Sequence, residues 1–177
     1  MEEILVDEYG YKQFFDELEK LKQLSMFNAS VGSEAYNEAI GDGWHDNFVF
    51  EETMRESRVI ATRIDKMLQT QKFLKVISTE QYYNDLINIG DVLKLEIKYD
   101  FDDSEITIIR LTGKYLPDTN ANIQEISLNS PIGRAIYMKN IYDENIYYMI
   151  NNKKIEIKVI EKLESKIKEV IESDFRY

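Results

Sequence analysis

Two aspartates in a short glycine-containing segment are the residues of this chain whose type and spacing best suit chemistry. The segment reads Gly41-Asp42-Gly43-Trp44-His45-Asp46-Asn47, so two carboxylates stand four residues apart with an aromatic pair between them. Mg²⁺ takes oxygen ligands and keeps several waters, so one or two carboxylates are often all that a protein supplies. Two aspartates on a projecting turn make only part of a site, and we expect them to help hold Mg²⁺ in the cleft of a partner.

A structural role is the alternative for the same residues. Asp42 fits a turn, and Asp46 stands where a following helix needs an N-cap, at which a side-chain oxygen accepts a hydrogen bond from a free backbone N–H. A lone histidine such as His45 is more often a surface residue than a ligand. Trp44 favours a contact with a partner, because large exposed aromatic side chains tend to mark interfaces.

The composition excludes several classes of function. The 177 residues carry 22 Lys+Arg and 33 Asp+Glu, a formal net charge of -11, which does not suit binding to nucleic acid or to an anionic membrane through clustered cations. Cysteine is absent and histidine occurs once, which excludes disulfides, thiol catalysis and a multi-histidine metal site within one chain. No apolar run is long enough to span a bilayer, and the first residues are acidic, so we expect a cytoplasmic protein that does not insert into membranes.

Two long helices are predicted to position the aspartates. Apart from Gly10 and Gly32, residues 7–40 and 46–77 contain none of the two strongest helix breakers, Gly and Pro. A short turn between two such helices makes them pack antiparallel, as an arm about 45 Å long at 1.5 Å per residue. Each helix has a seam with steps of three and four residues, which is large and apolar far from the turn and small or polar near it. The seam positions are Tyr11, Phe14, Leu18, Leu21, Ser25, Asn28, Gly32, Ala35 and Ala39 on the first helix, and Thr53, Ser57, Ile60, Ile64, Met67, Gln71 and Leu74 on the second.

Residues 80–160 are predicted to form a small antiparallel sheet with one short helix. Apolar and charged residues alternate over 93–99, which is typical of a half-buried strand, and 106–111, 126–128, 146–150 and 155–160 also read as strands. A serine before a proline at Ser130-Pro131 is a helix-start signal, because the hydroxyl accepts a free N–H and proline lacks one. Asn151-Asn152 suggests a hairpin turn, and 163–175 reads as an amphipathic helix. The expected domains are therefore 1–79 and 80–177, in the α+β class.

Two motifs resemble the Gre family of bacterial transcript-cleavage factors, GreA and GreB. Gly41-Asp42 followed by Asp46-Asn47 resembles the tip of that family, which reads G-D-x-x-E-N-A-E-Y. The stretch from Ile126 through Ser130-Pro131-Ile132-Gly133 to Ala135 resembles the family motif I-S-x-x-S-P-I-G-x-A. The likeness runs in one order from about Tyr9 to about Ile160.

The resemblance implies an N-terminal antiparallel coiled coil and an FKBP-like C-terminal domain. It implies that the C-terminal domain docks on the rim of the secondary channel of bacterial RNA polymerase while the coiled coil enters the channel. Asp42 and Asp46 would then help to hold Mg²⁺ shared with the polymerase, near the 3′ end of the nascent RNA, and the polymerase itself would cleave backtracked RNA. Such a chain is no enzyme alone, binds no cofactor stably alone, and acts as a monomer. The resemblance assigns partner contacts to Trp44, His45, Asn47, Ser130, Pro131, Ile132, Gly133 and Arg134.

The tip departs from the family pattern and leaves an alternative open. The acids are four residues apart instead of three, the second is Asp instead of Glu, and Phe48-Val49-Phe50 replaces A-E-Y. A regulator that occupies the channel without stimulating cleavage is therefore the alternative. Two functions of other classes remain: a chaperone-like hairpin that clamps client proteins, and prolyl isomerisation by an FKBP-like sheet.

Overall fold

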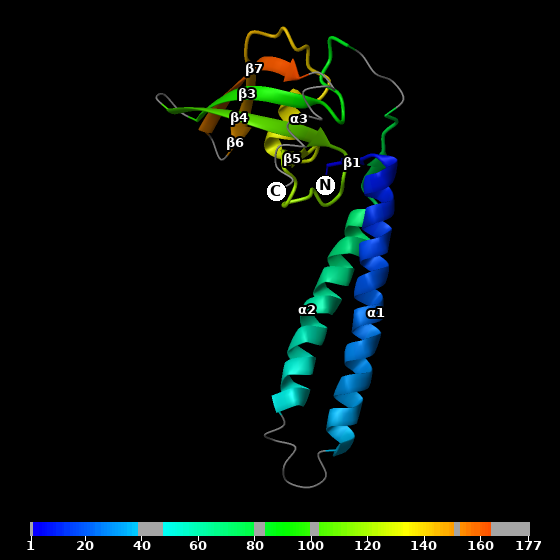
Figure 1. Cartoon of the computed structure of the whole chain (residues 1–177). Coiled ribbons are helices and arrows are strands. Elements are labelled where there is room, and N and C mark those ends of the chain that lie inside the picture. Colours follow the sequence, from blue (N-terminus) through cyan, green and yellow to red (C-terminus); the bar gives the residue numbers. More distant parts are fainter. Residues whose placement is uncertain (1, 39–47, 80–83, 100–102, 151–152, 164–177) are drawn as a thin grey trace. The chain divides into compact units, whose positions relative to one another are not determined.

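The computed structural model describes residues 2–38, 48–79, 84–99, 103–150 and 153–163, and the chain divides into two compact units. The first unit comprises Met1–Glu3 and Lys12–Leu74, and the second comprises Ile4–Tyr11 and Lys75–Tyr177. Helices dominate the first unit and a sheet dominates the second, which is an α+β organisation (Figure 1). In the described part of the chain, no helix is long and apolar enough to cross a bilayer.

The first unit contains most of α1 (Glu8–Glu38) and all of α2 (Phe48–Gln71). Three side-chain contacts between the helices fix their relative direction. Arg63 Nη2 lies 3.6 Å from Glu17 Oε1, Asn28 Nδ2 donates to Glu56 Oε2 over 3.2 Å, and the rings of Tyr36 and Phe50 lie 6.0 Å apart. The residue numbers rise along α1 as they fall along α2, so the two helices run antiparallel.

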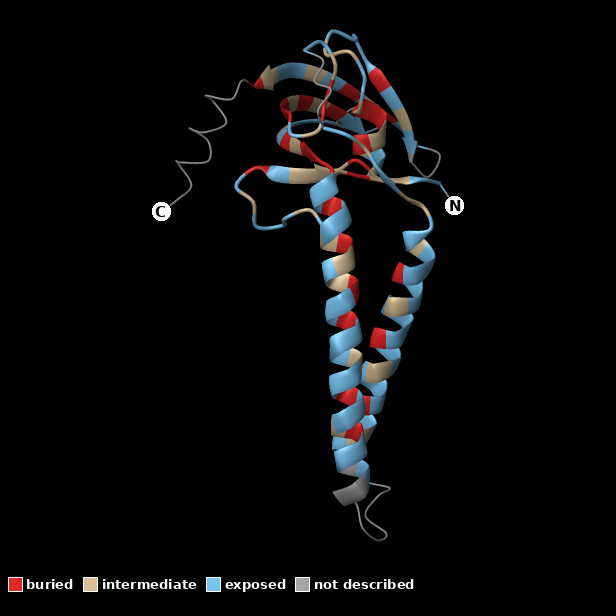
Figure 2. Cartoon of the chain, turned by 90° about the vertical axis from the view of Figure 1, so that its right-hand side faces the viewer, coloured by how far each residue is buried: buried red, intermediate tan, exposed pale blue. Residues whose placement is uncertain are grey.

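The interior of this helical pair has the predicted gradation. Phe14, Leu18 and Leu21 on α1 are buried far from residues 39–47, as are Ile60 and Met67 on α2. Near those residues the buried positions are Asn28, Gly32 and Thr53, which are polar or small. In Figure 2 the buried positions of α2 lie along the side that faces α1. The end of the pair next to residues 39–47 is therefore held by fewer apolar contacts than the opposite end.

The second helix is shorter than predicted. It ends at Gln71, which is exposed, and Leu74–Val76 forms strand β2 instead of a last helical turn. Strand β2 pairs with β1 (Ile4–Val6) in a two-stranded sheet, and Ile77 N–H donates to the Val6 carbonyl over 2.9 Å. The helical spacing of Leu74 and Ile77 was outweighed by this pairing, which involves a partner some 70 residues earlier in the chain.

The second unit contains a five-stranded sheet whose strand order is β5-β4-β3-β7-β6 (Figure 1). Its strands are β3 (Val92–Tyr99), β4 (Asp103–Thr112), β5 (Gln124–Ser127), β6 (Ile146–Ile150) and β7 (Lys153–Leu163). The prediction of an antiparallel sheet is wrong for one pair, since β4 and β5 are parallel. A long connection, residues 113–123, separates these two strands and brings the chain back to pair with Ile109–Thr112, the last part of β4, whereas a tight hairpin would have made the strands antiparallel.

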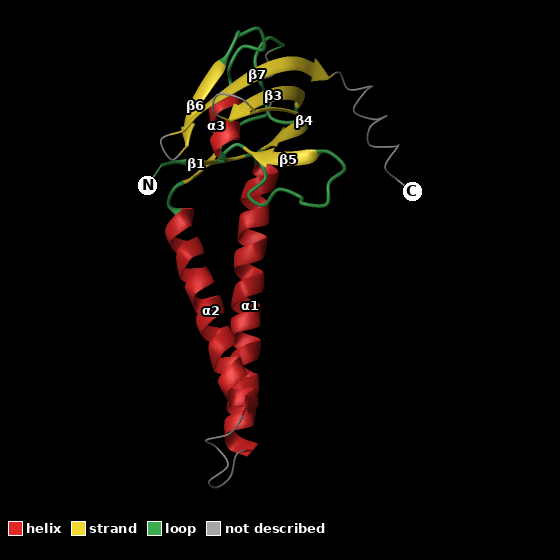
Figure 3. Ribbon diagram, turned by 90° about the vertical axis from the view of Figure 1, so that its left-hand side faces the viewer, coloured by secondary structure: helices red, strands yellow, loops and turns green. Residues whose placement is uncertain are grey.

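One face of the sheet carries the core of the unit. Leu93, Leu95 and Ile97 of β3 are at most 2% exposed, while the intervening charged residues are more accessible, as the period-two pattern predicts. The short helix α3 (Pro131–Ile136) contributes Ala135 and Ile136 to the same core and lies against the sheet (Figure 3). The predicted turn at 151–152 and nearly all of the predicted helix 163–175 lie outside the described residues.

Candidate functional site

The predicted metal-binding segment joins the ends of two antiparallel helices. Asp42, Asp46, Trp44, His45 and Asn47 all lie within residues 39–47, outside the described part of the chain. The helices that flank this segment end at Glu38 and begin at Phe48. The roles of the five residues therefore remain predictions, and what the structure adds is their place between two helix ends.

Exposed apolar side chains begin directly after this segment. Phe48 is 75% exposed and Val49 is 54% exposed, whereas Phe50 is partly covered and contacts the ring of Tyr36. These residues occupy the positions at which the family pattern has A-E-Y. A partner that receives the segment would therefore meet apolar bulk beside it.

Metal binding has no other candidate in the parts of the chain that are described. Among those residues no group of three or more His, Cys, Asp or Glu side chains is arranged to hold an ion. The donor set of Asp42 and Asp46 fits Mg²⁺ in chemical type, because both residues offer carboxylate oxygens. Two donors make an incomplete site, which suits an ion shared with a partner.

The second motif folds into a tight turn between β5 and α3. Ser130 is the N-cap of α3: its hydroxyl accepts a hydrogen bond from the Gly133 N–H over 3.0 Å and donates one to the Ser127 carbonyl over 2.8 Å. Pro131 occupies the first helical turn, where a missing N–H costs nothing. Sequence reasoning therefore located this helix start correctly, and the structure adds that the Ser130 hydroxyl has internal partners.

Gly133 is fixed by its close approach to the preceding strand. A Cβ at this position would lie 2.1 Å from the Ser127 carbonyl oxygen and 3.0 Å from the Leu128 Cα. Both are backbone atoms, which cannot turn aside as a flexible side chain can. Gly133 is also buried, so its role in the described structure is to let α3 pack on β5.

Asn129, which sequence reasoning did not single out, ties the motif to the first strand. Its side chain accepts a hydrogen bond from the Leu5 N–H over 2.8 Å and donates one to the Leu5 carbonyl over 2.7 Å. The carboxamide thus pairs with Leu5 as a neighbouring strand would. The sequence separation of 124 residues explains why no local pattern signals this contact.

The outward residues of the motif line an open, mainly apolar groove of about 440 Å³ in the second unit. Pro131 is exposed and Ile132 is partly buried against the core. The groove is lined by Tyr99, Pro117, Glu125, Ile126, Ser127, Ser130, Pro131, Ile132 and Ile155. Arg134, also predicted to contact a partner, lies in the last turn of α3, is partly buried and is not part of this lining.

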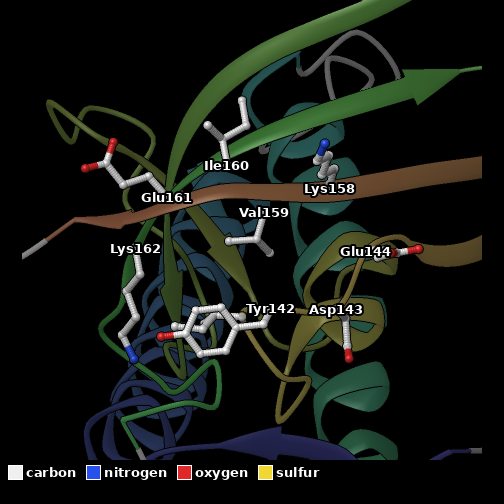
Figure 4. Close-up of a pocket in the computed structure, with 9 residues that line it drawn as sticks. Tyr142, Asp143, Glu144, Lys158, Val159, Ile160, Glu161 and Lys162 are labelled. Carbon is white, nitrogen blue, oxygen red and sulfur yellow. The ribbon is translucent and has the colours of Figure 1, made fainter.

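A second pocket, of about 360 Å³, lies between the 141–144 loop and the end of β7 (Figure 4). Figure 4 shows Val159 and Lys162 directed from β7 toward the Tyr142 ring. Lys162 Nζ lies 2.7 Å from Oδ2 of Asp91, which is 1% exposed, and also donates to the Leu86 carbonyl over 3.1 Å. This lysine therefore has a structural role in joining β7 to the loop before β3.

No protein-family model matches the chain, and no curated protein matches it. Several solved structures align with most of it. GreA factor homologue 1 (Gfh1) of Thermus thermophilus is 17% identical, over 92% of this chain and 99% of that one, with a TM-score of 0.41. Gfh1 of Thermus aquaticus is 18% identical over 93% and 100%, with a TM-score of 0.41. The elongation factor GreA/GreB from Nitrosomonas europaea is 11% identical over 93% and 100%, with a TM-score of 0.34.

These structures bear the names of the family that the two sequence motifs resemble.

Proposed function

We propose that this chain is a Gre-type transcription elongation factor that binds bacterial RNA polymerase. In this proposal the helical pair is the coiled coil that enters the secondary channel, and the FKBP-like domain docks on the channel rim. The chain is no enzyme by itself, and the active site of the polymerase cleaves the backtracked RNA.

The observation that carries the proposal is the position of the two motifs on their elements. The first motif, Gly41-Asp42 and Asp46-Asn47, lies in the segment between the end of α1 and the start of α2, which run antiparallel. The second motif, Ser130-Pro131-Ile132-Gly133, builds the turn into α3. The motifs lie far apart in the sequence and occur in the family order. A chance match to one motif would not be expected to come with the second motif in the family order.

The groove beside α3 supports docking by the second unit. It is open and mainly apolar, and Pro131 and Ile132 of the motif contribute to it. Such a surface suits an apolar segment of a protein partner.

Within the proposal, Asp42 and Asp46 supply carboxylate oxygens to a Mg²⁺ ion held jointly with the polymerase. That ion would supply charge stabilisation and help to orient a water at the reacting phosphodiester. The part of this chain is to carry two carboxylate oxygens to the active site of the polymerase.

A cleavage assay on a purified, backtracked polymerase complex tests the function. We expect the unmodified chain to accelerate cleavage, and the Asp42→Ala, Asp46→Ala double variant to leave cleavage at the rate of the polymerase alone. Glu34→Ala with Glu51→Ala is the matched control, because it removes two exposed carboxylates from the adjoining helices. Equal stimulation by the chain and the aspartate double variant would contradict the metal-donor role.

A second candidate function is favoured by the exposed Phe48 and Val49 and by the changed spacing of the acids. Here the chain occupies the channel and slows nucleotide addition without stimulating cleavage. The same complex, with Mg²⁺ titrated, separates the two functions: faster cleavage supports the first, and slower addition without cleavage supports the second.

Docking is tested separately from cleavage by co-purification with core polymerase. Tyr99 lines the groove and is 44% exposed, so Tyr99→Lys is expected to weaken binding. Tyr142→Lys is the matched control, because Tyr142 is 76% exposed and lies outside the groove. If the chain does not co-purify at all, a clamp for other client proteins becomes the better explanation.

A further inference from the structure

The first half of β4 forms a sheet edge with no neighbouring strand among the described residues. β5 pairs with β4 only from Ile109 to Thr112 (Figure 1). On its other side β4 pairs with β3 along Asp103 to Arg110 without a shift of register. Within the described part of the chain, residues 103–108 therefore have a strand on one side only.

The hydrogen bonds of Leu111 and Thr112 determine which backbone groups point out of this edge. Leu111 N–H donates to the Asp91 carbonyl and the Leu111 carbonyl accepts from Gly90 N–H, so Leu111 faces the β3 side. The Thr112 carbonyl accepts from Leu128 N–H, on the opposite side. In an antiparallel pair the direction alternates by residue, so Ser104, Ile106 and Ile108 direct their N–H and C=O groups away from β3.

The side chains of this edge carry little of the usual protection against pairing with another chain, since Glu105 is the one charged residue in 104–108. Ile106 is 62% exposed and Ile108 is 37% exposed. Natural edge strands are commonly blunted by lysine, proline or a bulge, and residues 104–108 read Ser-Glu-Ile-Thr-Ile, with none of these.

We propose that two copies of this chain associate by pairing these edges antiparallel around a two-fold axis at Ile106. β5 limits the register, because a partner strand has room only along residues 103–108. Centring the axis on Ile106 places Ile106 opposite Ile106 of the second copy, and Ile108 opposite Ser104. The outward N–H and C=O groups of these three residues then bond to those of the other copy, as in an ordinary antiparallel ladder.

The sequence of the edge is compatible with its own copy in this register. Exposed isoleucines meet on one face of the joined sheet, where β-branched pairs are favourable. On the other face Glu105 stands opposite Thr107, so no two like charges oppose each other directly. The two Glu105 side chains lie diagonally, roughly 7–8 Å apart, so their repulsion is modest and is screened by salt.

The association is weak and strengthens with salt. An edge this short buries less surface than the roughly 1,200 Å² at the lower limit for stable complexes. Each copy also carries a formal net charge of -11, so the two copies repel, and added salt screens that repulsion. Monomers consequently dominate in dilute solution. This proposal does not depend on the proposed function.

Amide hydrogen exchange and sedimentation of the full chain test the proposal, from about 20 µM to about 1 mM, a range that brackets weak affinities. We expect the Ile106 and Ile108 amides to become protected as concentration rises, in parallel with dimer formation. The Thr107 amide faces β3 and is expected to be protected at every concentration, which makes it an internal control.

Ile106→Pro is the decisive variant. It removes an N–H that points out of the edge, leaves the bonds to β3 in place, and proline is tolerated on edge strands. Dimer formation should be lost in this variant and kept in Met149→Lys, a change at the opposite edge. The proposal is overturned if the chain stays monomeric throughout, if the Ile106→Pro variant still dimerises, or if the Ile106 amide is already protected at all concentrations.

Discussion

Replacing Gly133 by alanine tests the structural reading of the second motif most directly. The added Cβ would lie 2.1 Å from the Ser127 carbonyl oxygen, so α3 and β5 must separate by more than 1 Å to restore an ordinary carbon–oxygen contact. That carbonyl also accepts from the Ser130 hydroxyl over 2.8 Å and from the Ser130 N–H over 3.0 Å. The separation that relieves the contact therefore strains both of these hydrogen bonds.

The expected loss of stability follows from these contacts. Overpacking costs about 1–3 kcal/mol and each weakened hydrogen bond about 1 kcal/mol, while alanine in a helix gains at most about 1 kcal/mol over glycine. We expect a net loss of about 3 kcal/mol in the free energy of unfolding, because the crowding outweighs the gain in helix propensity. For a chain of this length that loss lowers Tm by about 6–12 °C.

Urea and thermal unfolding followed by circular dichroism measure this change, and Gly32→Ala is the matched control. Gly32 lies within α1, where a Cβ would meet Thr53 Cγ2 at 3.4 Å, an ordinary contact. The same substitution should therefore stabilise α1 by up to about 1 kcal/mol. The reasoning is refuted if Gly133→Ala unfolds within about 0.5 kcal/mol of the unmodified chain, the spread of neutral surface changes, or if Gly32→Ala loses as much.

Three further predictions concern the second unit. Asn129→Ala removes both hydrogen bonds to Leu5 and should cost about 1–3 kcal/mol, with faster amide exchange at Leu5 in a hydrogen-exchange measurement. Lys162→Met leaves the buried Asp91 carboxylate without its ammonium partner and should lower the free energy of unfolding in urea by about 3–5 kcal/mol. The double variant Asp91→Asn with Lys162→Met should lose less, because no buried charge is left unpaired. Burial raises the pKa of Tyr137 above its usual value, so folding favours the neutral phenol. The stability that the neutral Tyr137 phenol contributes is fully present below pH 10, the usual pKa of tyrosine, and is lost as the pH rises through the raised pKa. Ultraviolet titration should show one fewer phenol ionising at high pH in the Tyr137→Phe variant than in the unmodified chain.

The parts of the fold that sequence reasoning predicted well are those with local signals. The alternation in 93–99 and the Ser130-Pro131 helix start depend on neighbours within a few residues, and the structure places β3 and α3 there. The parallel pairing of β4 with β5 and the pairing of β1 with β2 depend on partners distant in the sequence, so no local pattern indicates them. The end of α2 was misjudged for that reason, because Leu74 fits a helical seam and a strand equally well.

Sequence reasoning reached the two candidate sites to different degrees, and Asp42 and Asp46 stay a prediction because they lie outside the described residues. Residue types alone singled out Asp42 and Asp46, since carboxylates four residues apart suggest an oxygen-ligand site. The groove could not be predicted in the same way, because Tyr99, Pro117 and Ile155 reach it from separate elements. Asn129 escaped notice because an asparagine in a turn is common, and its pairing with Leu5 is visible only in three dimensions.

The four residues of the Ser130-Pro131-Ile132-Gly133 motif form two pairs, one that builds the turn and one that lines the groove. Ser130 and Gly133 form the turn itself, Ser130 through the hydrogen bonds of its hydroxyl and Gly133 through its close approach to Ser127. Pro131 and Ile132 line the groove, so a substitution at either residue changes the surface that a partner would contact. Changes at the first pair should therefore lower stability and polymerase binding together. A change at Pro131 should lower binding alone, and a Pro131→Lys variant that is fully stable yet binds polymerase as the unmodified chain does would show that the motif serves only to build the fold.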